Sequence, residues 1–243
     1  VFPGITNRIL GKYVDKIAIS FEEASKYFKQ KNKLIVTGNP IRQEFFSVST
    51  EEAKTKYKTQ KDKPLVLIVG GSGGSIHINK VVNNMMIKYP NNSFQVLLVT
   101  GKKHYNEVIK SISQHKELLV NNRVLEYIND MPYALIACDL IVCSAGAITI
   151  TEINAVGKPA ILIPKAYTAE NHQEYNAIAL EKRGAALVIK EKDLNEDYLY
   201  SKIQEILNSK EKLKAMEKSS INASKKNATD LIYKEIIYLT KHK

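Results

Sequence analysis

Short apolar runs recur along most of the chain and are separated by stretches of helical length. The expected strands are Leu65–Val69, Gln95–Val99, Val124–Tyr127, Leu140–Cys143, Ala160–Ile163 and Ala186–Ile189. Strands that alternate with helices in this way are typical of a parallel sheet with helices on both faces. Further helices follow, the first at about Glu196–Leu207 with Asn195 as its cap. The pattern therefore predicts an α/β fold built on a doubly wound parallel sheet.

The first 46 residues carry a shorter pattern. The expected elements are a helix to about Tyr13 that Thr6 or Asn7 caps, a strand at Lys16–Ser20, a helix at Glu22–Phe28 and a strand at Leu34–Val36. Two helices and two strands are too few to enclose a core, so we expect this segment to pack on another part. A charged helix and a polar linker follow over Glu51–Lys63. We therefore divide the chain into residues 1–46, a linker of residues 47–63 and a main domain of residues 64–243.

The fourth expected strand leads into the first candidate binding site. A turn of small residues that includes Gly146 follows it, and a helix is expected over Ala147–Val156 with Gly157 as its C-terminal cap. The unpaired N–H groups and the positive dipole end of this helix favour an anion such as phosphate. Glu152 would repel a phosphate but accept hydrogen bonds from vicinal hydroxyls such as those of a ribose. A nucleotide pocket is one interpretation, and a strand, turn and helix packed for stability alone is the other.

A glycine-rich turn, GGSGGS at Gly70–Ser75, directly follows the first strand of the main domain. Such a turn lets a phosphate or a sugar approach the backbone. It does not match GxGxxG, because Ile76 stands where the third glycine belongs, and it lacks the Gly-Lys-Ser/Thr of a P-loop. Both glycine turns follow the carboxyl ends of strands, where open parallel sheets bind their ligands. The second turn therefore strengthens the case for a binding pocket.

A third candidate site is Glu170–Asn176, at the start of the helix after the fifth strand of the main domain. Amide side chains in a first helical turn can hydrogen-bond sugar hydroxyls, although caps and surface groups show the same residue types. His172 has no partner that the sequence identifies, so we interpret it as structural rather than as a catalytic base. The sequence shows no Asp-x-Asp and no cluster of His or Cys, so we predict no metal site.

Composition narrows the classes of partner. Hydrophobic residues make up 44% of the 243 residues, and no apolar run approaches the ~20 residues that span a bilayer. Lys and Arg number 36 against 25 Asp and Glu, and the net charge of +11 suits nucleic acid, an anionic membrane surface or a phosphorylated substrate. The basic residues are scattered and no nucleic-acid motif is present, so we expect no nucleic-acid partner. Cys138 and Cys143 are expected to be reduced core residues.

Three blocks of sequence, in this order, resemble the MurG family of glycosyltransferases: GGSGGS, VCSAGAITITEINAVGKPAILIP and NHQEYNAIALEKRGAALVI. The upstream segments PGITNRIL and VTGNPIR fit as well, and the resemblance weakens after about Asn195. It implies the Rossmann-like C-terminal domain of a two-domain GT-B enzyme of glycosyltransferase family 28, preceded by a remnant of the N-terminal domain. The implied reaction is inverting transfer of N-acetylglucosamine from UDP-N-acetylglucosamine to the undecaprenyl-linked muramyl pentapeptide of peptidoglycan. The resemblance implies no cofactor and a peripheral location on the cytoplasmic face of the bacterial cell membrane, against an anionic surface.

The resemblance also assigns site residues. It places Arg42 and Ser72 on the donor phosphates, Ile128 against the uracil and Gln173 on the sugar. The other implied donor contacts lie along one helix, with Glu152 on the ribose hydroxyls: Ala147, Ile148, Thr149, Ile150, Thr151 and Glu152. Further candidates near the glycine turns and the sugar are Gly71, Gly73, Gly146 and Asn176.

The chain departs from the family pattern before PGITN. The family has a Gly-Gly-His turn and a His-Glu-Gln-Asn block there, and this sequence, which opens on Val1, has neither. We expect a fragment without most of the acceptor domain, the catalytic base and part of the membrane-docking surface, which binds donor but transfers little or no sugar alone. Two alternatives stay open: a half-enzyme whose acceptor domain is a separate subunit, and a non-catalytic UDP-sugar-binding module. UDP-sugar epimerases share the GT-B plan, but the motifs fit the transferase better.

Overall fold

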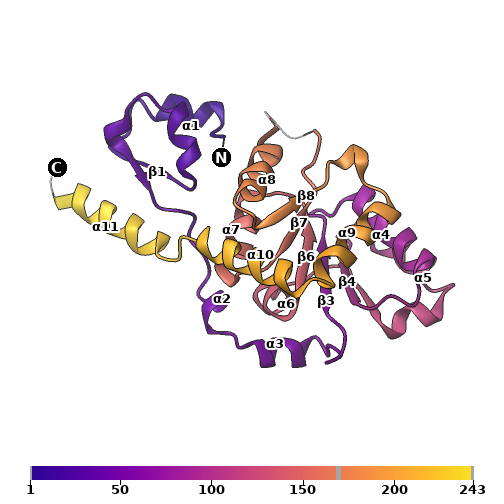
Figure 1. The fold of residues 1–243 in the computed structure, drawn as a ribbon. Coiled ribbons are helices and arrows are strands. Elements are labelled where there is room, and N and C mark those ends of the chain that lie inside the picture. Colours follow the sequence, from indigo (N-terminus) through magenta and orange to yellow (C-terminus); the bar gives the residue numbers. More distant parts are fainter. Residues whose placement is uncertain (1, 168–170, 242–243) are drawn as a thin grey trace.

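The main part of the fold is a parallel sheet of six strands. The structure is a computed structural model, and it describes residues 2–167 and 171–241. The strands lie in the order β5-β4-β3-β6-β7-β8 (Figure 1). Their bounds are β3 (Leu65–Val69), β4 (Gln95–Val99), β5 (Asn122–Leu125), β6 (Leu140–Cys143), β7 (Ala160–Leu162) and β8 (Ala186–Val188). From β3 the chain winds outward to β5, then returns to the other side of β3 and winds outward again to β8.

Helices cover both faces of this sheet, because successive side chains of each strand point to opposite faces. In β3, Leu65 and Leu67 belong to one core cluster, whereas Val66 and Ile68 belong to the other. The first face carries α2 (Glu44–Ser47), α3 (Thr50–Lys56), α6 (Met131–Ala137), α7 (Ala147–Val156) and α8 (His172–Lys182). The second carries α4 (Ile76–Lys88), α5 (Tyr105–Ile112), η3 (Lys116–Val120) and α9 (Glu196–Leu207), and the predicted doubly wound parallel sheet is confirmed.

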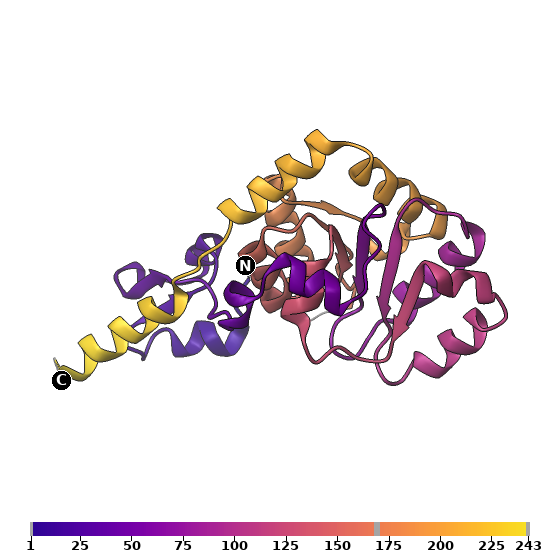
Figure 2. The same ribbon diagram turned by 90° about the horizontal axis from the view of Figure 1, so that it is seen from below.

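The N-terminal residues form a small unit beside the main sheet. It contains α1 (Ile5–Leu10), β1 (Ile17–Ile19), η1 (Glu22–Tyr27), η2 (Lys31–Lys33) and β2 (Leu34–Val36). Strands β1 and β2 pair in parallel over a small apolar cluster that includes Ile17 and Phe28. After η5 (Glu191–Asp193), α9 and α10 (Lys210–Asn222), the last helix α11 (Ala228–Lys241) runs alongside this unit (Figure 2), where Lys16 and Glu235 approach to 3.9 Å. The boundary between the two units near residue 46 stays a prediction.

The expected elements match the structure closely in the sheet and less closely near the N-terminus. Helix α1 begins after Gly4, which occupies the N-cap position with an extended backbone. The expected caps Thr6 and Asn7 instead lie inside the helix. The segment expected as a helix at Glu22–Phe28 forms the 3-10 turn η1 instead of an α-helix. Strand β5 begins two residues earlier than expected, because the Asn122 side chain accepts a hydrogen bond from the Val96 N–H and donates one to the Leu118 carbonyl. Within the described residues, no helix is long and apolar enough to cross a bilayer.

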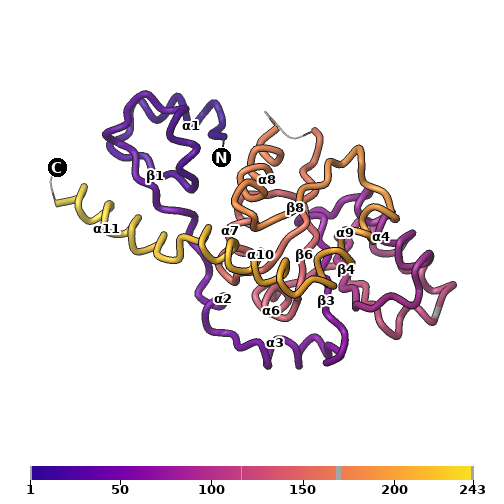
Figure 3. Tube along the Cα trace, viewed as in Figure 1, coloured from indigo at the N-terminus to yellow at the C-terminus, as the bar shows by residue number. Residues whose placement is uncertain are grey.

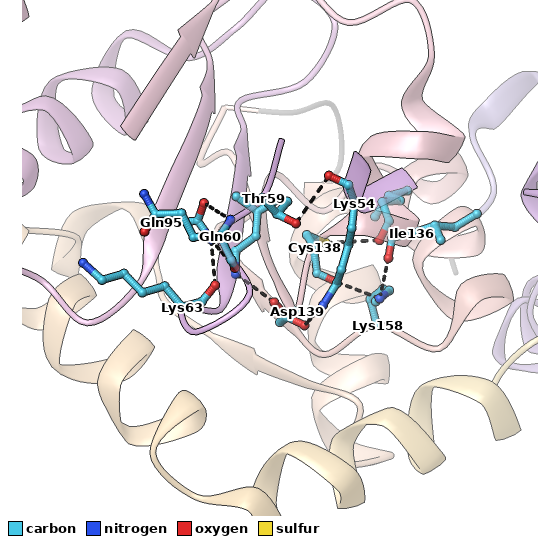
Figure 4. A network of polar contacts seen from close by, with 11 residues as sticks. Lys54, Thr59, Gln60, Lys63, Gln95, Ile136, Cys138, Asp139 and Lys158 are labelled. Carbon is cyan, nitrogen blue, oxygen red and sulfur yellow. Dashed lines mark hydrogen bonds and ion pairs between the residues drawn. The ribbon is translucent and has the colours of Figure 1, made fainter. Parts of the chain in front are cut away.

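The segment that joins the two units is held against the amino ends of the strands. Figure 3 shows the chain passing from the N-terminal unit through α2 and α3 to β3. Two buried or half-buried polar side chains fasten it there (Figure 4): Asp139 accepts hydrogen bonds from the Leu65 N–H at 2.8 Å and from Lys54 at 3.4 Å. Gln95 accepts from the Gln60 N–H at 2.9 Å and donates to two carbonyls. The α3 part of the segment therefore lies at the end of the sheet opposite the carboxyl ends of the strands.

We expect Gln95→Ala to lower the free energy of unfolding by about 1–3 kcal/mol, because it leaves partly buried backbone groups of Gln60 and Lys63 without these partners. Urea unfolding measures this change. Gln114→Ala is the matched control: Gln114 is exposed, and its replacement is expected to change stability by less than about 0.5 kcal/mol. Equal stability of both variants would show that the Gln95 contacts do not hold the joining segment.

Candidate functional site

A pocket of about 220 Å³ opens where the winding direction of the sheet reverses, between β3 and β6. Ligands of doubly wound sheets bind at this switch point because the two loops that leave adjacent strands diverge there. The pocket is lined by Arg42, Val69, Gly71, Ser72, Val99, Gly101, Tyr127, Ile128, Asn129, Met131, Ile141, Cys143, Ser144, Thr149 and Glu152. Its walls are therefore the two predicted glycine turns, the loop after β5 and the first turns of α7.

The N-terminus of α7 is the better of the two anion sites. Gly146 occupies its N-cap position, and no described side chain caps the N–H groups of the first turn. Helix α4, which follows the other glycine turn, is different: the Ser75 hydroxyl accepts a hydrogen bond from the Ile78 N–H. Since a capped helix end has fewer free donors, an anion is expected at α7 rather than at α4.

The glycine-rich turn lies close to the α7 turn. Gly71 and Gly74 have φ of +92° and +76°, a region that favours glycine, and the Gly74 N–H donates to the Gly71 carbonyl at 2.9 Å. A Cβ atom on Gly71 would lie 3.2 Å from the Ser144 hydroxyl oxygen. The two turns therefore present their backbones to the same small volume.

Glu152 and Arg42 face each other across the pocket. One guanidinium nitrogen of Arg42 lies 3.7 Å from a carboxylate oxygen of Glu152, and the side chains are 51% and 16% exposed. Burial raises the pKa of the Glu152 carboxyl, and the Arg42 guanidinium opposes this rise. The pocket thus holds a partly buried carboxylate, which can accept hydroxyl hydrogen bonds, beside a cation that can reach an anionic ligand.

A hydrogen bond explains how Arg42, distant in the sequence, reaches this pocket. The Asn39 amide donates to the Thr151 hydroxyl at 2.9 Å, and Thr151 donates to the Ala147 carbonyl at 2.8 Å. The Gly-Asn-Pro-Ile-Arg segment is thereby fastened to the first turns of α7. The guanidinium also lies 5.3 Å above the Phe45 ring, which orients it further.

The third candidate segment lies at the start of α8. The Gln173 side chain accepts a hydrogen bond from the Lys165 N–H at 3.1 Å, and the Asn176 amide donates to the Ala145 carbonyl at 3.1 Å. The His172 ring lies 5.5 Å from the Phe2 ring, centroid to centroid. Glu170, the first residue of the predicted segment, lies outside the described residues. These contacts join α8 to the loop after β7 and to the α7 turn.

The structure brings together some of the predicted site residues and places the others nearby. Arg42, Gly71, Ser72, Ile128, Thr149 and Glu152 line the pocket. Ile148 is exposed, Ile150 is in the core, and Thr151 and Asn176 are buried with the hydrogen-bond partners given above. Ala147 lines a separate hollow with the N-terminal unit. Gly73 and Gly146 lie on the surrounding turns, and Gln173 lies in the first turn of α8. The donor contacts assigned to all these residues stay predictions.

Sequence reasoning missed several lining residues. Tyr127 and Asn129 flank Ile128 in the loop after β5, and Ser144 begins the α7 turn. Their position after the carboxyl ends of strands could have identified them, because ligands of such sheets bind to the loops at that edge. Both cysteines are buried thiols without a disulfide in the described chain, and burial raises the pKa of each to about 12.

Comparison with known proteins agrees with this geometry. The model of the glycosyltransferase family 28 C-terminal domain matches residues 65–232, which include the sheet and both glycine turns. The chain belongs to glycosyltransferase family 28. A relative from Alkaliphilus metalliredigens is 55% identical over 99% of this chain and 66% of its own length. It is named UDP-N-acetylglucosamine–N-acetylmuramyl-(pentapeptide) pyrophosphoryl-undecaprenol N-acetylglucosamine transferase.

Other family members and solved structures extend the comparison. A relative of the same name from Acetivibrio thermocellus is 46% identical over the full chain and 65% of its own length. The chain thus spans about two thirds of the length of these relatives. The crystal structure of Acinetobacter baumannii MurG matches with a TM-score of 0.74 at 21% identity, over 98% of this chain and 64% of that one. At this identity the match shows the GT-B fold alone.

The glycine turn offers a matched pair of substitutions. We expect Gly74→Ala to destabilise the chain by about 2–5 kcal/mol, because φ is +76° and the new Cβ would lie 2.0 Å from the Thr100 carbonyl oxygen. Gly73→Ala is the control: no described atom lies within 4 Å of its Cβ position, so the change is expected to stay below about 1 kcal/mol. Thermal unfolding of both variants measures the difference. Equal effects would contradict the turn geometry described above.

Proposed function

We propose that this chain binds UDP-N-acetylglucosamine in the switch-point pocket. In this proposal it supplies the donor-binding part of an enzyme that transfers N-acetylglucosamine to the undecaprenyl-linked muramyl pentapeptide. The observation that carries the proposal is the placement of Glu152 beside the open N-terminus of α7, in one pocket. A carboxylate that can accept hydroxyl hydrogen bonds and a helix end that favours an anion thus share one pocket, which supports a nucleoside diphosphate as the ligand. The names of the 55% and 46% identical relatives support the same donor and acceptor.

The pocket residues fit the parts of this donor. The uracil would lie against Ile128 in the loop after β5, and Glu152 would accept hydrogen bonds from the ribose hydroxyls. The diphosphate would lie over the first turn of α7, within reach of Arg42 and Ser72. The sugar would then extend toward Gln173 at the start of α8.

The same groups would assist the reaction. When the bond between the sugar and the diphosphate breaks, negative charge develops on the departing UDP. The open helix end and the Arg42 guanidinium would stabilise this charge, since donors fixed in advance need no reorganisation. The acceptor hydroxyl also needs a base, and we assign none to this chain. The expectation that these 243 residues transfer little or no sugar by themselves stays a prediction.

The acceptor suggests where the protein works. An undecaprenyl-linked muramyl peptide is held in a membrane, so the enzyme must approach a lipid surface. The net charge of +11 favours an anionic surface. We therefore propose a peripheral location on the cytoplasmic face of the bacterial cell membrane.

Calorimetric titration with UDP-N-acetylglucosamine tests the donor site. We expect Glu152→Ala to weaken binding by about 1–3 kcal/mol, the usual range for a hydrogen bond to a charged group. Glu211→Ala is the matched control, because Glu211 is exposed on α10. We expect this variant to bind UDP-N-acetylglucosamine as tightly as the wild type does. Binding that is insensitive to Glu152→Ala would place the ribose elsewhere.

The raised pKa of Glu152 predicts a dependence of donor affinity on pH. Ribose binding uses the ionised carboxylate, so affinity should fall as the pH decreases through the pKa of Glu152. Because burial raises this pKa above the ordinary value of 4.5, the loss should begin at a higher pH than for an exposed glutamate. Glu152→Gln is expected to remove this component of the pH profile. A profile that Glu152→Gln leaves unchanged would assign the titration to another group.

A further inference from the structure

One buried hydroxyl of the pocket has no partner in the described part of the protein. Six serine and threonine side chains are buried there: Thr37, Ser75, Thr100, Ser144, Thr151 and Ser220. All but one of them hydrogen-bond to backbone or side-chain groups. Ser144, which lines the pocket and is 6% exposed, makes no side-chain hydrogen bond to a described residue. Because buried polar groups are nearly always paired, this hydroxyl points to a ligand.

The backbone on both sides of Ser144 is fixed. The Cys143 carbonyl accepts a hydrogen bond from the Ile163 N–H at 2.8 Å, and the Ala145 carbonyl accepts one from the Asn176 amide at 3.1 Å. These bonds join the turn after β6 to the end of β7 and to α8. The hydroxyl therefore loses little entropy when it binds a ligand, because the chain that carries it is already ordered.

The hydroxyl faces the space beside the glycine-rich turn. Its oxygen lies 3.2 Å from the place that a Cβ atom on Gly71 would take. Gly71 has no Cβ, and both residues line the pocket, so a ligand atom can take this space. An O–H···O hydrogen bond spans about 2.5–3.0 Å. A ligand oxygen near that place would therefore be within hydrogen-bond reach of Ser144.

The position of Ser144 indicates an anionic oxygen as its partner. Ser144 precedes the N-cap residue Gly146 by two positions, and no described side chain caps the first turn of α7. The dipole of this helix favours negative charge at the same end. A hydroxyl can donate one hydrogen bond, and a bond to a charged acceptor is stronger than one between neutral groups. A phosphate oxygen at the helix end would thus be a strong acceptor for Ser144.

We propose that the Ser144 hydroxyl donates a hydrogen bond to the diphosphate of the bound nucleotide, in the space between the two glycine turns. Ser144 is then a diphosphate-binding residue whose hydroxyl is paired by the ligand rather than by the protein. The inference rests on the proposed function, because it takes a nucleotide in this pocket as given.

Thermal unfolding of the ligand-free chain tests whether Ser144 serves the fold. We expect Ser144→Ala to lower Tm by no more than about 1 °C, since it removes no hydrogen bond within the described protein. Ser220→Ala is the matched control, because it removes hydrogen bonds to the Ile153 carbonyl and to the Asn154 side chain. It should lower Tm by about 2–4 °C. An equal loss in both variants would give Ser144 a structural role and overturn the proposal.

Calorimetric titration of the full chain with UDP tests the bond to the ligand. We expect Ser144→Ala to weaken UDP binding about ten- to a hundredfold, the range for a hydrogen bond to a charged group. Ser144→Thr keeps the hydroxyl and should recover part of the loss. Ser113→Ala removes an exposed hydroxyl at the end of α5 and should leave the affinity unchanged. In the phosphorus NMR spectrum at saturating UDP, Ser144→Ala should move a phosphate resonance, whereas Ser113→Ala should not.

The outcomes separate this inference from the proposed function. If folded Ser144→Ala binds UDP as tightly as the wild type, or more weakly with unchanged phosphate resonances, Ser144 does not hold the diphosphate and the nucleotide site itself remains. If the wild-type chain does not bind UDP, the proposed function fails, and the role of Ser144 fails with it. Weaker binding with a moved phosphate resonance and a retained Tm supports both.

Discussion

The parallel pairing of β3 with β6 is the constraint on which the site depends. About seventy residues separate these strands, yet Val66 to Val69 lie in register with Leu140 to Cys143. Because both strands end at the same edge, the glycine-rich turn and the α7 turn leave it side by side and then diverge. The pocket between them is a consequence of topology. The chemical character of the pocket is set by the side chains and backbone groups of the loops that line it.

Electrostatic balance decides what this pocket can hold. The uncapped α7 terminus favours an anion, Glu152 can accept hydrogen bonds from hydroxyls, and Arg42 partly neutralises Glu152. The proposed ligand, a nucleoside diphosphate, carries negative charge next to a diol and would satisfy these groups together. The proposal agrees with membership of glycosyltransferase family 28.

The local sequence predicted those elements whose residues determine them locally. Strands β3 and β6 are uniformly apolar, and β4 is apolar after Gln95. Helix α7 ends at the cap Gly157, and α9 begins at the cap Asn195. The start of β5 was missed because Asn122 joins the sheet through its side chain, which hydrophobic patterning does not register. The close approach of Gly71 to Ser144 depends on strand order, and periodicity alone does not determine that order. The Asn39–Thr151 hydrogen bond, which positions Arg42, could not be predicted from the local sequence either, because it joins residues that are 112 positions apart.

A crystal structure of the chain with bound UDP is the decisive test of the proposed site. We expect electron density for the diphosphate over the first turn of α7, with a carboxylate oxygen of Glu152 within about 3.2 Å of a ribose hydroxyl. A nucleotide bound away from the β3–β6 switch point, for instance in the polar groove between α4 and α5 that Asn79 and Asn83 line, would contradict it.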